Sequence, residues 1–347
     1  MAFQRIVVGV DFSTASLNAV RWVAGQFAPQ ARVFVVHVVT APRTPAFLRG
    51  ERVPRAAPAQ PEASLYPGLR VFADLAGAAR SDVEIRTGSP SAELARVAME
   101  VDADLVCVGR TRKRRGSGRF GATTPQRLLS RTNIPVLIVP DTARLLPGAV
   151  LAAVSGGTDG REVLRAAGRL AAKWGVRLDA LQAIEPEVLA AVDGSIAADE
   201  AHLSLRAREW LSRQAAEVAP PALQVRAIAR HGDAGEETIA HAARNEIGLI
   251  VTERRTRDGA VEEGGGAFDP GSTTRMITWA SSCPVLVLGG SLPNGSRGEA
   301  IAAPPRRWQL APMAQLTVTG GRGSVGGGRP GALRPPRRPT PGGDDAA

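Results

Sequence analysis

The residues best suited to bind a ligand stand in the first part of the chain, each at a predicted boundary between elements. Asp11 and Gly109 follow short apolar runs, and the loop 110–121 leads to Thr123 and Thr124 at a predicted helix start. Glycine lets a backbone approach a phosphate closely, and a helix N-terminus presents free N–H groups to an anion. The pattern indicates a phosphate-containing ligand.

These residues would share one edge of an open parallel sheet. Such a sheet places its ligand crevice outside the carboxyl ends of its strands, where the strand order reverses. The carboxylate of Asp11 suits a hydrogen bond to a ribose or an adenine edge better than a phosphate. The predicted nucleotide-binding residues of this part are Val10, Asp11, Val38, Val108, Gly109, Gly121, Ala122, Thr123 and Thr124.

The elements that must position these residues occur twice along the chain. Three segments of the first part reappear in the same order in the second, with one loop lengthened before the last of them. The matching segments are 6–13 with 150–157, 83–109 with 225–253, and 128–140 with 276–288.

Each copy alternates strands and helices. The strands are continuous apolar runs, which suit a parallel sheet buried on both faces. Ser89 and Pro90 begin one helix, and Asp233 with Glu236 gives a capping pattern in the second copy. We predict an α/β fold of two tandem, doubly wound, parallel five-stranded sheets. The expected domains are 1–142 and 147–290, followed by a disordered tail at 291–347, too rich in Gly, Pro and Arg to bury a core.

Several segments together resemble one known family. VVGVDFS at the start, VHVV at 36–39, TGSPSAELARVA at 87–98, DLVCVG at 104–109 and GATTPQRLLSRTNIPVLIVP look like the universal stress protein family. The resemblance covers roughly 3–140 and, more weakly, 149–288. It implies an adenine nucleotide alpha hydrolase-like fold with strand order 3-2-1-4-5 in each copy.

The resemblance also implies partners. Closing strands of this family usually mediate pairing, so 135–139 is expected to pair with 284–288 within the chain, and the tandem could also form a homodimer. One subgroup binds ATP through a Gly-x2-Gly-x9-Gly-Ser/Thr loop after the fourth strand. We therefore expect ATP, with Mg²⁺, as the cofactor of a stress-response or regulatory module.

The ATP loop carries over only in part. Gly109 matches the first glycine, but Arg112 stands at the second and Ala122 at the third, with Thr123 as the hydroxyl. Gly121 takes the place of the third glycine if one residue is inserted around Pro125 relative to the family's loop. Arg110 and the arginines and lysine of 112–115 would supply charge to a triphosphate. Whether ATP binds stays open at this point.

The second copy departs further from the loop. Gly271 and Ser272 keep the helix-start element, but Ser155 replaces Asp11 and Glu253 replaces Gly109. We expect a degenerate, structural copy. SGGTDG at 155–160 is similar to the loop of ATP pyrophosphatase-type enzymes, although no substrate-side residues follow and coincidence is favoured.

The positive charge of the chain raises nucleic-acid binding as a further hypothesis. The chain carries +10, concentrated in 110–119, with six basic residues, and in the tail, with eight arginines against three acids. Nucleic-acid binding through these segments is one reading, and a solvated loop and tail is preferred because Trp308 is the tail's one aromatic residue. A scaffold that binds proteins and no nucleotide is the other alternative.

The remaining residues suggest no catalysis. The histidines and the two cysteines, Cys107 and Cys283, have no metal-ligand spacing, so no metal site is expected. No nucleophile elbow occurs, and we expect no enzyme beyond slow ATP hydrolysis. His37 is expected to be a packed core histidine. Without a signal peptide or a membrane-length apolar run, the protein is expected in the cytoplasm.

Overall fold

The computed structural model describes most of both copies. The described residues are 3–27, 31–40, 62–77, 80–111, 123–144, 148–154, 160–185, 200–254 and 272–289. The predicted tail at 291–347 lies outside them.

The first copy alternates strands and helices as predicted. Helix α3 follows Ser89 and starts on Pro90, and Leu94, Val97 and Ala98 form its buried face. The strands are β1 (Arg5–Val10), β2 (Arg32–Val39), β3 (Arg80–Thr87), β4 (Leu105–Arg110) and β5 (Val136–Pro140). The helices are α1 (Thr14–Phe27), α2 (Glu62–Leu75), α3 (Pro90–Glu100) and α4 (Thr124–Leu129).

The second copy repeats this order. Asp233 caps α8, because its Oδ1 accepts hydrogen bonds from the N–H groups of Gly235 at 2.8 Å and Glu236 at 2.9 Å. The strands are β6 (Ala149–Ala153), β7 (Leu178–Ile184), β8 (Val225–His231), β9 (Ile247–Glu253) and β10 (Val285–Leu288). The helices are α5 (Gly160–Trp174), α7 (Glu200–Val218), α8 (Ala234–Arg244) and α9 (Ser272–Ala280).

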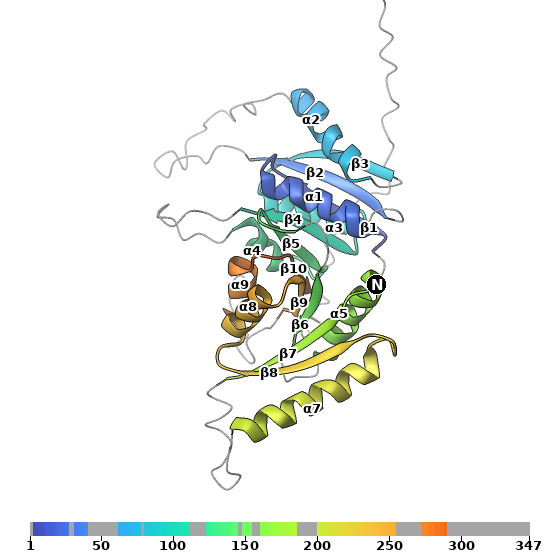
Figure 1. The fold of residues 1–347 in the computed structure, drawn as a ribbon. Coiled ribbons are helices and arrows are strands. Elements are labelled where there is room, and N and C mark those ends of the chain that lie inside the picture. Colours follow the sequence, from blue (N-terminus) through green and yellow to red (C-terminus); the bar gives the residue numbers. More distant parts are fainter. Residues whose placement is uncertain are drawn as a thin grey trace, which may run out of the picture. The chain divides into compact units, whose positions relative to one another are not determined.

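The two five-stranded sheets join into one. The order is β3-β2-β1-β4-β5-β10-β9-β6-β7-β8, so each half has the predicted 3-2-1-4-5 order (Figure 1). The predicted pairing of the closing strands is confirmed: β5 and β10 pair antiparallel, with Leu137 opposite Leu286. These two leucines correspond in the repeat, so a local twofold axis passes between them.

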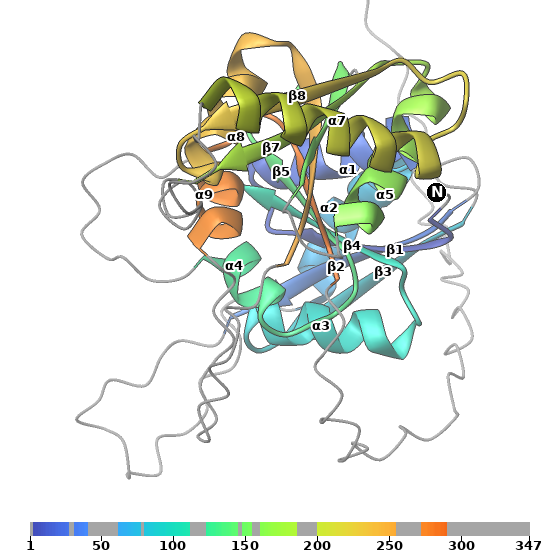
Figure 2. The same cartoon turned by 90° about the horizontal axis from the view of Figure 1, so that it is seen from below.

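The helices form two layers. Buried residues of α1, α2, α5 and α7 belong to one hydrophobic cluster, and those of α3, α4, α8 and α9 to the other. Trp22 of α1 and Trp174 of α5 join the copies within the first layer, with ring centroids 5.6 Å apart. Figure 2 shows α7 lying along β8 at the end of the sheet.

Positive φ values at matched positions of the two copies are further evidence of the duplication. Gly88 and Gly232, which correspond in the repeat, have φ values of 152° and 131° before helices α3 and α8. Asp102 and Glu246 also correspond, and their φ values are 47° and 54° in the left-handed region. Shared unusual conformations at matched positions show that both copies keep the same chain path.

Candidate functional site

The parallel registers bring Val10, Val38, Val108 and Gly109 to one edge of the sheet, where Asp11 follows β1. β1 and β4 are paired up to Val108, and Val10 lies beside His37 of β2. Val10 and Val108 are buried, whereas Val38 and Gly109 are half-buried. The side chains at this edge therefore combine an apolar floor with partial access to solvent.

Asp11 is the charged group of this edge. Its Oδ1 accepts hydrogen bonds from the Ser13 N–H at 3.0 Å and from the Ser13 Oγ at 2.5 Å. Partial burial opposes ionisation of Asp11, but the bonds from Ser13 outweigh it and lower its pKa below 3.8. The carboxylate is therefore ionised at neutral pH and can accept hydrogen bonds from a sugar hydroxyl.

An aromatic group beside Asp11 was not predicted from the sequence. Phe12 has a φ of 61° and an exposed fraction of 41%. Its ring centroid lies 4.9 Å from that of His37 and 5.7 Å from that of Phe72 in α2. The half-buried His37 is tied to the backbone, with Nδ1 2.7 Å from the carbonyl oxygen of Val10. An exposed aromatic face next to an ionised carboxylate can stack a base.

Gly109 is required by packing whatever it binds. A Cβ at this position would lie 2.4 Å from the carbonyl carbon of Ala15 and 2.5 Å from the nitrogen of Ser16, both in α1. Glycine is the residue that lets the end of β4 pass so close to the start of α1. The match of Gly109 to the family's loop is therefore not by itself evidence of a ligand.

The expectation that Arg110 reaches a triphosphate is wrong. Its guanidinium is buried and donates hydrogen bonds to the carbonyl oxygens of Trp279 and Ser281, at the end of α9 in the second copy. Carbonyls at a helix C-terminus carry partial negative charge and attract a cation. The sequence could not reveal this contact, because it depends on how the two copies pair.

The remaining loop residues are described only in part. Thr123 and Thr124 are half-buried at the start of α4, where the Thr123 N–H donates to Oε1 of Gln126 at 2.9 Å. The predicted residues Gly121 and Ala122, and the basic segment 112–115, lie outside the described residues.

The matching edge of the second copy has different residues. Glu253, the counterpart of Gly109, is buried, and its carbonyl oxygen accepts a bond from Thr274 Oγ1 at 3.1 Å. Arg254, the counterpart of Arg110, lies with Nη1 3.5 Å from Oδ1 of Asn133, and burial lowers its pKa to about 10. Ser272 begins α9, whereas Gly271 and Ser155 are outside the described residues.

The second copy instead holds a buried polar network at the opposite end of its strands. Asp179 of β7 is fully buried and bonds to Arg177 Nε at 3.1 Å, Arg226 Nη2 at 2.5 Å and His241 Nε2 at 2.9 Å. Burial disfavours the charged carboxylate, but hydrogen bonds from His241 and the two arginines lower the pKa of Asp179. Asn245 Oδ1 accepts a further bond from Arg226 at 3.0 Å.

The strand order 3-2-1-4-5 in each half, with helices on both faces, defines a doubly wound α/β protein built from two copies of one unit. The sequence profile of the universal stress protein family matches residues 2–140 and again residues 148–289. The chain belongs to the universal stress protein family and carries two of its domains in tandem.

Two solved structures that match most of the chain share its fold. A universal stress protein from Archaeoglobus fulgidus DSM 4304 is 15% identical, with a TM-score of 0.55, over 82% of this chain and 97% of that chain. A functionally unknown protein from Pseudomonas aeruginosa PAO1 is 16% identical, with a TM-score of 0.56, over 83% and 92%. A universal stress protein crystallised in complex with cAMP is 27% identical, with a TM-score of 0.30, over 41% of this chain and 99% of that chain.

No curated protein matches the chain. Within the described ranges, none of the helices combines the length and the apolar character needed to cross a membrane.

Proposed function

We propose that the chain is a cytoplasmic stress-response or regulatory module that binds one adenine nucleotide, ATP with Mg²⁺, in its first copy. The observation that carries this proposal is the ionised carboxylate of Asp11 beside the exposed ring of Phe12, at the carboxyl edge of the sheet. Asp11 would accept bonds from the ribose, Phe12 would stack the base, and Thr123 would face the phosphates. The module is not an enzyme beyond slow hydrolysis of the bound nucleotide.

A scaffold without nucleotide is the second candidate. Gly109 is explained by its close approach to α1, and Arg110 by its hydrogen bond to α9. Neither residue type therefore requires a ligand, which favours the scaffold. In that case the second copy and the inter-copy contacts are the functional part of the molecule.

Calorimetry separates the two candidates. The full chain is titrated with ATP and with cAMP in the presence of Mg²⁺, beside Asp11→Ala and the matched control Asp74→Ala, an exposed carboxylate of α2. Binding of one nucleotide that is weakened about tenfold or more by Asp11→Ala and unchanged by Asp74→Ala supports the proposal. Absence of binding by the wild-type chain removes it and leaves the scaffold.

A further inference from the structure

Within the described ranges, the edge strand β8 has no strand paired with the backbone groups of its outer side. Leu178 N–H donates to Gln224 O, and Gly232 N–H donates to Ile184 O at 3.1 Å. In a parallel ladder, this pattern means that the N–H and C=O groups of the even-numbered residues of β8 point toward β7. The N–H and C=O groups of Ala227 and Ala229 therefore point away from the sheet. Such an edge is a template for another strand.

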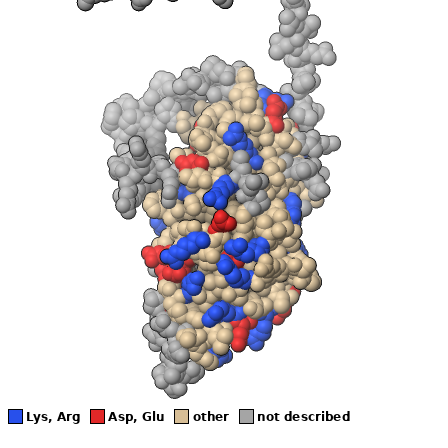
Figure 3. Space-filling view, in the orientation of Figure 1, with Lys and Arg blue, Asp and Glu red and all other residues tan. Residues whose placement is uncertain are grey.

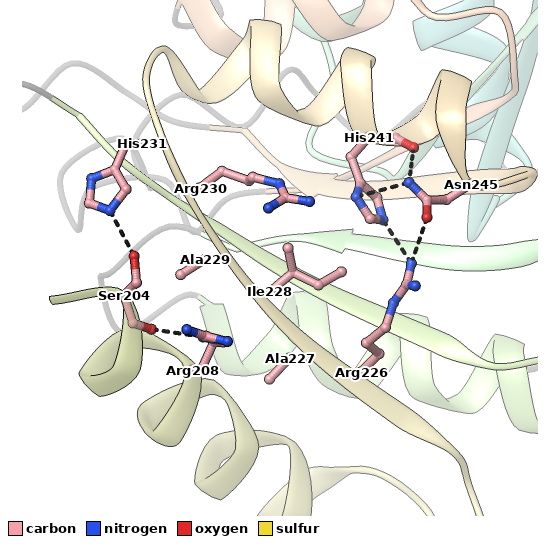
Figure 4. Close-up of a pocket in the computed structure, with 10 residues that line it drawn as sticks. All are labelled: Ser204, Arg208, Arg226, Ala227, Ile228, Ala229, Arg230, His231, His241 and Asn245. Atoms are coloured by element: carbon pink, nitrogen blue, oxygen red, sulfur yellow. Dashed lines mark hydrogen bonds between the residues drawn. The ribbon is translucent and has the colours of Figure 1, made fainter. Parts of the chain in front are cut away.

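A groove runs along this edge between two helices (Figure 4). Ser204 and Arg208 of α7 form one wall, and His241 and Asn245 of α8 form the other. His231 at the end of β8 is fixed by its Nε2, which lies 2.7 Å from Ser204 Oγ. Between the walls, the alanines of β8 leave the backbone accessible to an extended chain.

The groove is cationic. Arg208, Arg226 and Arg230 line it, and the sequence of β8, VRAIARH, contains no acid. Asp179 neutralises Arg226, whereas neither Arg208 nor Arg230 has an acidic partner within the ranges that the structure describes. Figure 3 shows more basic than acidic side chains over the lower part of its face, where Figure 1 places the second copy. Positive charge beside a free strand edge attracts a negatively charged partner.

The opposite edge of the sheet does not share this character. β3 carries Asp82, which pairs with Arg32 at 2.7 Å, and Glu84, which pairs with Arg86. An acidic chain would meet carboxylates there. Among the described residues of β3, carboxylates thus offset the arginines, unlike in β8.

We infer that the β8 groove binds an extended acidic segment of a partner protein, which adds to the sheet as a further strand. Main-chain hydrogen bonds to Ala227 and Ala229 give the affinity, and Arg208 and Arg230 select carboxylates on the added strand. A nucleic acid would use the arginines but not the outward backbone groups, and the described residues that line the groove include no Phe, Tyr or Trp to stack bases.

The test uses the full chain and a fluorescein-labelled synthetic peptide of alternating glutamate and valine, followed by fluorescence anisotropy. The double variant Arg208→Glu/Arg230→Glu is expected to weaken binding about tenfold or more, because it reverses both selecting charges. The control Arg206→Glu/Arg213→Glu makes an equal charge change at two exposed residues of α7 that do not line the groove, and it is expected to change binding less than about twofold. An equal loss of peptide affinity in the groove variant and in the control variant would overturn the proposal.

A second variant isolates strand addition from charge. Ala229→Pro removes an outward N–H that β7 does not use, and proline is tolerated at such an edge position. It is expected to weaken the peptide about fivefold while leaving the binding of a single-stranded RNA of equal charge unchanged. Hydrogen exchange, measured on the wild-type chain, should slow at Ala227 and Ala229 on peptide binding and not in β3. RNA binding tighter than peptide binding, or no slowing in β8, would overturn the proposal.

Discussion

The two copies place their polar chemistry at opposite ends of their corresponding strands. In the first copy, Asp11 and Phe12 lie at the carboxyl ends of the strands, while Phe34 and Val97 form an apolar layer nearer the other end. In the second copy the positions matching Phe34 and Val97 are Asp179 and His241, and they hold a buried ion pair network.

The difference shows which features the fold requires. Both copies keep the positive φ values at Gly88 and Gly232 and the same strand order, although their side chains at matched sites have changed class. Duplication thus preserved the chain path, and each copy then acquired its own polar residues. The comparison predicts that substitutions at matched positions have unequal effects.

Removing the buried carboxylate of the second copy should cost most. Asp179→Ala leaves Arg226, Arg177 and His241 without their shared partner, so the free energy of unfolding should fall by about 3–5 kcal/mol. Urea unfolding of the full chain measures this. Asp82→Asn is the control, because Asp82 and Arg32 are 40% and 47% exposed and their pair should contribute under about 1 kcal/mol.

The same network fixes a pH dependence. The folded-state pKa of Asp179 is lowered, so its stabilisation is present above the unfolded pKa of about 3.8 and is lost as pH falls through the folded value. Stability curves of the wild type and Asp179→Ala should converge in acid. A difference that stays constant down to pH 2 would show that the charge is not responsible.

A methyl group at Gly109 should have the next largest effect. Gly109→Ala forces Cβ against the backbone of Ala15 and should destabilise the first copy by about 2–3 kcal/mol. Gly25→Ala, where an added Cβ has no neighbour within 4 Å, should be neutral or slightly stabilising. Thermal unfolding of both variants tests whether packing, rather than a ligand, demands glycine at 109.

Arg110 tests the contact between the copies. Arg110→Met removes two charged hydrogen bonds to carbonyls of α9 and should lower stability by about 2 kcal/mol. The exposed Arg131→Met should change it by less than about 0.5 kcal/mol. Limited proteolysis of the α9 region should accelerate only in the first variant, and equal rates would remove the assigned role.

The smallest effect is expected at Ser13. Ser13→Ala deletes the hydroxyl bond to Asp11 and should raise the pKa of Asp11 toward 3.8. It also deletes the bond that Ser13 Oγ accepts from Ser16 N–H at the start of α1, which should lower stability by about 1 kcal/mol. NMR titration of the Asp11 carboxyl measures the shift. An unchanged pKa would mean that the Ser13 hydroxyl does not hold the carboxylate ionised.

The duplicated fold could be predicted because its signals are local. Apolar runs, the Ser89–Pro90 helix start and the Asp233 cap depend on neighbouring residues only, and all appear in the structure. β3 begins at Arg80, three residues before the apolar pattern from Val83 onward, because an edge strand tolerates polar residues.

The candidate site could be predicted only in part. Asp11 and Gly109 were found because parallel strands end at a common edge. Phe12 was missed because nothing in its local sequence shows that its ring stays exposed. Asp179 and Arg110 were missed or misplaced because their partners are distant in sequence, and only tertiary pairing brings them together.

Photocrosslinking tests the asymmetry between the copies most directly. The full chain is irradiated with a photoreactive azide analogue of ATP and Mg²⁺, and labelled peptides are identified by mass spectrometry. The account predicts label near Asp11 and Phe12 in the first copy, competed by ATP and lost in Asp11→Ala. Label of equal strength near Glu253 or Ser272, or label in the second copy alone, would contradict it.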